Sequence, residues 1–148
     1  GWILLLSYPV PLLALDPDAW RPWWSLPAAV EWALLGLAVM SFAFTWWARV
    51  DLGRLWSAGL TRKEGHQVIS SGAYGIVRHP IYTGLCGAAL VTFLIRACPA
   101  AALGCAFFLI GYWVKAREEE RFLAVELDAQ SYDDYRRRVP MLLPFVHF

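Results

Sequence analysis

The stretch that decides the fold is "IYTGLCGAALVTFLIRACPAAALGCAFFLIGYWV", residues 81–114. It holds two apolar runs, residues 81–95 and 97–114, separated by the short break "IRACP". Runs of this kind are typical of membrane-spanning helices, which take roughly 20 residues, and the shorter run can borrow flanking residues. Because the break is so short, we expect the two helices to lie antiparallel as a hairpin.

Two further apolar runs come before this hairpin, residues 1–15 and residues 26–48, the second interrupted only by Glu31. The chain is 59% hydrophobic and 17% charged, below the roughly 25% charged residues of soluble domains. We therefore predict one all-α, polytopic integral-membrane domain over residues 1–148. Its first two transmembrane helices lie in residues 1–48, which makes about four with the hairpin.

The basic residues are distributed unevenly between the connecting segments. The linker, residues 49–80, carries five of them and the tail, residues 115–148, carries six, whereas the opposite side has only Arg21 and Arg96. The positive-inside rule then places the linker and the tail in the cytosol. The tail is expected to continue the last helix and to end in an apolar segment that packs back on the bundle or lies at the interface.

Two function classes are disfavoured by composition. A formal net charge of +1 argues against a nucleic-acid-binding protein, which would carry a basic patch. The three cysteines have neither zinc-site nor disulfide-framework spacing, so we expect no metal site.

The segment "RHPIY", residues 78–82, brings polar groups to the start of the third apolar run. Pro80 suits the first turn of a helix, and the free N–H groups of a helix N-terminus can receive a carboxylate. Arg78, His79 and Tyr82 would then surround one small volume at the membrane surface. The alternative is that they only contact lipid phosphates, cap the helix and join an aromatic belt.

The segment "REEER", residues 117–121, follows the fourth run directly. It could be a solvated face of mixed charge. However, consecutive helical residues are 100° apart, so one or two of Glu118, Glu119 and Glu120 must face the bundle. Arg78 and His79 are their expected partners, which makes the pair of segments a candidate site.

A third polar segment is "SYDDYRRRVPMLLP", residues 131–144. Tyr132 and Tyr135 are three apart and share a helical face. The three arginines that follow could bind anionic lipid headgroups or face the site, and both interpretations stay open.

Together these motifs resemble the isoprenylcysteine carboxyl methyltransferase family, over roughly residues 51–145. The motifs are R-H-P-x-Y-x-G at residues 78–84, E-E-x-x-L at residues 119–123, and Y-x-x-Y-x-x-R-V-P-x-x-x-P at residues 132–144. The resemblance implies an integral-membrane enzyme that uses S-adenosylmethionine. Its cofactor pocket would lie at the cytosolic face, between the loop before the third helix and the C-terminal helix and segment. A lipophilic or prenylated acceptor would enter from the bilayer lipids.

By matching positions, the resemblance also implies site residues. The matched cofactor-binding residues are His79, Tyr82, Glu119 and Glu120, to which we add Tyr74, whose ring would face the sulfonium, and Gly84. Arg78 or Arg138 would orient a carboxylate acceptor, and Glu119 or His79 would act as base for an amine or hydroxyl acceptor. Lys115 stands where an arginine is common in relatives, and Asp128 and Ala129 replace a usual Phe-Gly pair.

Two other functions remain as alternatives. An NADPH-dependent reductase of the sterol-reductase type shares an R-H-P-x-Y region, although Ile81 and Leu85 stand where that group usually has a polar residue and an acid. A non-enzymatic lipid-binding membrane module would explain the polar clusters by headgroup contacts. The acceptor and the oligomeric state stay open.

Overall fold

The computed structural model describes residues 16–53, 70–126 and 129–146. The described chain is helical throughout, with four α-helices and no strand. In chain order its elements are η1 (Pro17–Trp20), α3 (Ala28–Leu52), η3 (Gly72–Gly75), α4 (Pro80–Arg96), α5 (Pro99–Glu126) and α6 (Ala129–Arg138). The all-α prediction is confirmed for this part of the chain.

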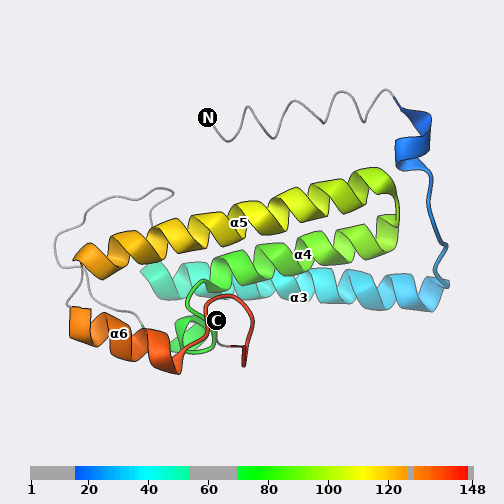
Figure 1. Cartoon of the computed structure of the whole chain (residues 1–148). Helices are drawn as coiled ribbons and strands as arrows, with labels where there is room; N and C mark the ends of the chain where they lie inside the picture. The colour runs from blue at the N-terminus through cyan, green and yellow to red at the C-terminus, as the bar shows by residue number, and fades with distance from the viewer. Residues whose placement is uncertain (1–15, 54–69, 127–128, 147–148) are drawn as a thin grey trace.

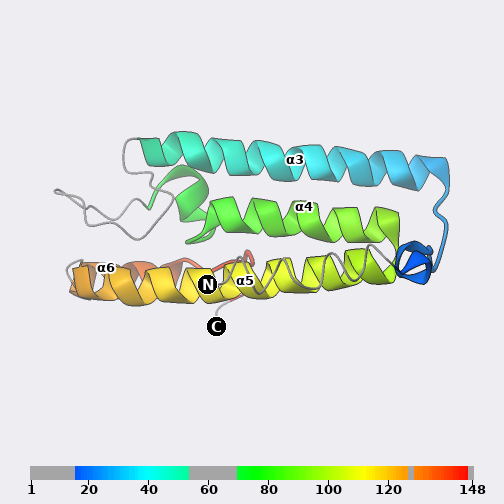
Figure 2. The same ribbon diagram turned by 90° about the horizontal axis from the view of Figure 1, so that it is seen from above.

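The three long helices lie side by side in a row, with α4 between α3 and α5 (Figures 1 and 2). At one end of the row η1 approaches the α4–α5 connection, and at the other end η3, α6 and the C-terminal segment gather (Figure 1). Since α4 packs against both α3 and α5, it is the helix that joins the other two.

Two of these helices, α3 and α5, are long and apolar enough to cross a membrane, whereas α4 has 17 residues and is shorter. The predicted first span, residues 1–15, lies outside the described residues. The total of about four spans therefore stays a prediction. α3 also extends to Leu52 and ends at Gly53, whose φ of 51° is favourable for glycine, so the linker predicted from residue 49 begins in helix.

The predicted hairpin is present. α4 ends at Arg96, and α5 begins at Pro99. Between them Ala97 is left-handed, with a φ of 48°, and is fully buried. Its N–H donates to Phe93 O at 2.7 Å, and its carbonyl accepts from Trp23 N at 2.7 Å. These two hydrogen bonds offset the cost of a left-handed non-glycine residue and join the η1 segment to the turn.

Small residues let α3 and α4 approach closely. Gly84 is buried, and a Cβ placed on it would lie 2.5 Å from Ser41 O and against Thr45 Oγ1. A Cβ on Gly87, one turn later, would lie 2.9 Å from Ser41 Oγ. Thr45 Oγ1 donates to Ser41 O at 3.0 Å and lies 3.5 Å from Ile81 O across the interface. Such small-residue contacts are the usual means by which helices associate in lipid.

Replacing Gly84 with alanine is therefore expected to destabilise the protein by about 1–3 kcal/mol, because the added methyl group meets backbone of α3 that cannot move aside. Gly104 of α5 is the matched control, since a Cβ there would meet nothing within 4 Å. Its alanine variant should be neutral or slightly more stable. Thermal unfolding in detergent compares the two variants, and equal midpoints would contradict the close approach.

Candidate active site

The candidate site lies at the end of the helical row that carries α6, away from the hairpin turn. It is built from three parts of the chain that are distant in sequence. The start of α4 supplies Arg78, His79 and Tyr82, the polar end of α5 supplies Glu119 and Glu120, and residues 139–142 cover them.

Arg78 joins these parts through its guanidinium. Its Nε donates to Glu120 Oε1 at 2.6 Å, and its Nη1 donates to the carbonyls of Arg136 and Val139 at 2.8 and 2.7 Å. Both ends of the ion pair are 7% exposed. A buried guanidinium is stabilised when several acceptors bind its N–H groups. Here the acceptors come from α5 and from the end of α6.

The backbone at the start of α4 holds the C-terminal segment. Arg78 N–H and His79 N–H donate to the carbonyls of Pro140 and Met141 at 2.8 and 3.1 Å, and Thr83 Oγ1 donates to Leu142 O at 2.7 Å. α4 begins at Pro80, as predicted, so the N–H groups just before it are free for this pairing. The predicted packing of the C-terminal segment back on the bundle is confirmed for residues 139–142.

His79 lies between the two acids. Its Nδ1 is 3.5 Å from Glu119 Oε2, and its Nε2 is 3.4 Å from Glu120 Oε1. Its ring stacks on Tyr82 at 5.5 Å with an interplanar angle of 4°, and Tyr82 OH donates to Glu119 Oε1 at 2.5 Å. His79 Nε2 is buried, and Glu120 Oε1 at 3.4 Å is its acidic neighbour, although the geometry of that contact is not that of a well-aligned hydrogen bond.

The charge of His79 depends on these neighbours. Burial alone would lower its pKa, but hydrogen bonding and charge attraction from Glu119 and Glu120 outweigh burial and raise the pKa above 6.5. When the imidazole is protonated, it and Arg78 balance the charges of the two carboxylates.

This arrangement predicts a pH dependence of stability. Folding raises the pKa of His79, so protonated His79 stabilises the folded protein. This stabilisation is complete below the pKa of the unfolded state, about 6.5, and is lost as the pH rises through the higher pKa of the folded state. The thermal unfolding midpoint should therefore decrease over that range in the native protein and change less in His79→Gln. Unfolding measured from about pH 5 to about pH 9 checks this. Parallel profiles for the two proteins would contradict it.

Tyr74 lies in η3, the short helix just before the start of α4. η3 is held by Asp51, whose Oδ2 accepts from Ala73 N at 2.9 Å. Gly72 has a φ of 59°, and a Cβ on it would collide with the Asp51 carboxylate, so this position requires glycine. The Tyr74 carbonyl accepts from Tyr135 OH at 2.8 Å. The Tyr74 side chain is buried in a cluster with Ala48 and Ala73, and burial raises its pKa above the ordinary value, with a further contribution from the negative charge of Glu119.

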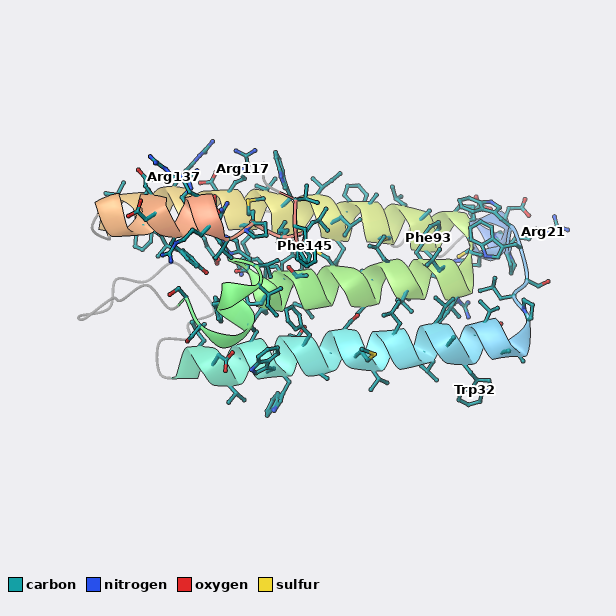
Figure 3. All side chains as sticks on the ribbon, turned by 90° about the horizontal axis from the view of Figure 1, so that it is seen from below. Arg21, Trp32, Phe93, Arg117, Arg137 and Phe145 are labelled. Atoms are coloured by element: carbon teal, nitrogen blue, oxygen red, sulfur yellow. The ribbon has the colours of Figure 1, made fainter. Side chains whose placement is uncertain are left out.

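The remaining predicted residues lie elsewhere. Gly84 contacts α3, and Arg138 is exposed on α6, where its Nε donates to Asp134 O at 3.2 Å. Glu118 is exposed and pairs with Arg121 at 2.9 Å, so Glu119 and Glu120 are the two acids that face the bundle. The exposed Arg117 and Arg137 lie on the outer side of α5 and α6 (Figure 3).

Sequence reasoning found no role for Asp51, although it begins the segment "DLGRLWS" within the region of resemblance. The predicted common face of Tyr132 and Tyr135 is confirmed. Both side chains are buried in a cluster with Val139 and Leu123. These contacts hold α6 against α5 beside the site.

Comparison with known proteins identifies related chains. The model of the isoprenylcysteine carboxyl methyltransferase (ICMT) family matches residues 34–125, more than half of the chain. The cobalt-zinc-cadmium resistance protein CzcN of Cupriavidus metallidurans is 26% identical, over 97% of this chain and 62% of its own length. Protein-S-isoprenylcysteine O-methyltransferase B of Arabidopsis thaliana is 24% identical, over 98% of this chain and 72% of its own length.

A third relative is methanethiol S-methyltransferase 2 of Bradyrhizobium diazoefficiens, which is 34% identical over 84% of this chain and 52% of its own length. The chain thus spans between about half and three quarters of the length of these three relatives.

Proposed function

Because the chain belongs to the isoprenylcysteine carboxyl methyltransferase family, we propose that it transfers a methyl group from S-adenosylmethionine to a lipophilic acceptor at the cytosolic membrane interface. The observation that carries the proposal is the convergence of the start of α4 with Glu119 and Glu120 of α5 under residues 139–142. The relatives named as O- and S-methyltransferases support the reaction class.

The residues present fit this cofactor. S-adenosylmethionine carries an ammonium, a carboxylate, ribose hydroxyls and a sulfonium, so its site needs both acceptors and donors. Glu119 and Glu120 offer carboxylate oxygens for the ammonium or the hydroxyls, and His79 offers an imidazole held between the two acids. Tyr82 and Tyr74 provide aromatic rings, which attract a cationic sulfur. Gly84 would serve this site indirectly, by seating the start of α4 on α3.

The bound cofactor supplies an electrophilic methyl group. The protein's residues then have to orient the acceptor and keep water away. An acceptor that is already an anion needs no base, and an arginine only has to hold it. Arg138 at the exposed rim could do so, while Arg78, already bound to Glu120 and two carbonyls, would position the acids. An acceptor that carries a proton needs a base, and Glu119 is the candidate.

The acceptor and the location are proposed from the membrane character of the helices. The names of two relatives give isoprenylcysteine and methanethiol as their acceptors. The candidate membrane spans α3 and α5 favour an acceptor that is dissolved in the bilayer. Arg21 and Arg96 lie at the η1 end, whereas the described basic residues at the site end are more numerous. By the positive-inside rule we place the site in a multi-pass protein at the cytosolic face.

One binding experiment tests the proposal against its alternatives. The protein in detergent is titrated with S-adenosylhomocysteine and, separately, with NADPH, and its thermal unfolding is followed. A ligand at about 100 times its Kd stabilises by about 2.7 kcal/mol. Stabilisation by S-adenosylhomocysteine alone is the expected result. Stabilisation by NADPH alone would favour the reductase, and no response to either would favour the lipid-binding module.

A further inference from the structure

The apolar segment after α6 divides into a buried part and an exposed part. Residues 139–141 are buried over the site, whereas Leu143, Phe145 and Val146 are 53%, 94% and 39% exposed. Single apolar residues on a surface need no explanation, but several of them gathered in one short segment indicate an interaction site. The exposed part therefore calls for a partner that the described part of the chain does not supply.

The segment runs along α4 towards the apolar part of that helix. The carbonyl of Pro140 accepts from Arg78 N–H at 2.8 Å, just before α4 begins, and the carbonyl of Leu142 accepts from Thr83 Oγ1 at 2.7 Å, within its first turns. Later residues of the segment thus contact later residues of α4. Leu143 is the next residue, so the exposed part begins where the covering part has already reached the helix.

The level of the membrane surface is marked on α5 by Trp113 and Arg117. The guanidinium carbon of Arg117 lies 5.0 Å from the centre of the exposed Trp113 ring, at the end of the apolar run. Such a pair is typical of the headgroup region. Figure 3 shows Phe145 nearer than Arg117 and Arg137 to the hairpin end, where Phe93 lies. Phe145 is therefore on the acyl-chain side of these arginines.

The backbone keeps the Phe145 side chain turned outward. Its φ of 67° lies in the left-handed region, which a bulky residue rarely adopts, and Val146 N–H donates to Leu143 O at 3.2 Å across the turn. Since the Phe145 side chain is almost wholly exposed, contacts with other side chains do not compensate the cost of this conformation. Contact between the ring and lipid would do so.

We propose that Leu143, Phe145 and Val146 form a membrane anchor that inserts into the leaflet on the side of the site. The partner is the acyl chains of that leaflet, and burying a phenylalanine among them is strongly favourable. Because the anchor follows residues 139–142 directly, its insertion also holds those residues over the site. This inference rests on the candidate spans and does not depend on the proposed methyl transfer.

Photo-crosslinking identifies what contacts Phe145. The photoreactive analogue p-benzoylphenylalanine is placed at position 145, the protein is reconstituted in phosphatidylcholine nanodiscs and irradiated, and the products are weighed by mass spectrometry. A lipid adduct is the expected product. Val39, exposed on the candidate span α3, is the position for a positive control, and Val125, exposed on α5 beyond its apolar run, is the position for a negative control.

Two other products would overturn the anchor. A covalent dimer without a lipid adduct would show that a second copy of the chain covers Phe145, and a crosslink within the chain would show that the bundle itself does. Lipid adducts in equal yield from positions 145 and 125 would also overturn it, because the label would then not distinguish insertion from chance contact.

Hydrogen exchange tests whether the anchor holds the covering residues. The N–H groups of Arg78 and His79 donate to carbonyls of the covering residues, so their exchange reports on its opening. In nanodiscs, Phe145→Ser should speed this exchange about tenfold, because it removes an apolar side chain from lipid. Phe145→Leu should restore most of the protection, and Val125→Ser should leave the exchange unchanged.

Exchange in Phe145→Ser that equals exchange in the native protein would overturn the link between the anchor and the cover. If Phe145→Ser does not fold, the comparison of Phe145→Leu with the native protein and the crosslink from position 145 still decide the proposal. Both keep an apolar side chain at this position.

Discussion

Glu120→Ala is expected to lower the free energy of unfolding by about 3–5 kcal/mol, because it leaves the guanidinium of Arg78 buried without its carboxylate. Arg78 would keep the carbonyls of Arg136 and Val139, but a carbonyl cannot neutralise its charge. His79 would lose one of the two acids that stabilise its protonated form. The loss should loosen the start of α4, the end of α6 and residues 139–142 together.

Thermal or denaturant unfolding in detergent measures this effect, and Glu118→Ala is the control. Glu118 is two residues away on the same helix and is also paired with an arginine, but both members of that pair are exposed. Exposed pairs contribute about 0–1 kcal/mol, so this variant should unfold close to the native protein. If the two variants unfold alike, the buried pair does not hold the site together.

Much of this architecture follows from patterns in the sequence. The hairpin follows from two apolar runs that meet at the turn sequence of residues 95–99. The start of α4 follows from Pro80, which suits the first turn of a helix. The meeting of His79 with the acids of α5 follows from the antiparallel hairpin, because the start of α4 and the polar end of α5 must lie at the same end. Their separation of 3.4–3.5 Å confirms this convergence.

Other features depend on contacts that no local pattern encodes. Three consecutive acids do not show which face of α5 is turned towards α4. In the structure, Glu119 and Glu120 contact His79, whereas Glu118 is exposed and pairs with Arg121. The motif in which Gly84 lies does not reveal that Ser41 and Thr45 occupy the space beside it. From the sequence, Arg78 and Arg138 were equal candidates for orienting a carboxylate acceptor. In the structure, Arg78 is buried and Arg138 is exposed.

Asp51 shows the same limit at longer range. Its carboxylate accepts a hydrogen bond from Ala73, 22 residues further along the chain, and requires glycine at position 72. Neither residue type predicts the other, since an acid at the end of a helix and a glycine before a turn are each common. The pairing arises because α3 and α4 pack closely through Gly84 and Gly87, which brings the end of α3 beside η3.

Glu119→Gln is expected to weaken the binding of S-adenosylhomocysteine about 10- to 100-fold, the effect of losing a hydrogen bond to a charged group. The amide keeps the size of the side chain and can still accept from Tyr82 OH, so the fold should persist. Calorimetric titration measures the affinity, and Glu118→Gln, on the exposed face, is the matched control. Unchanged affinity in Glu119→Gln would remove this acid from the cofactor site.

Turnover measured on the same variant separates the two roles proposed for Glu119. If it only binds the cofactor, saturating S-adenosylmethionine should restore most of the rate, because the weaker binding is overcome by concentration. If it also serves as base, kcat should stay reduced by about 100-fold or more at saturation. An acceptor that is already an anion needs no base, so kcat should recover for such an acceptor and stay reduced for one that carries a proton.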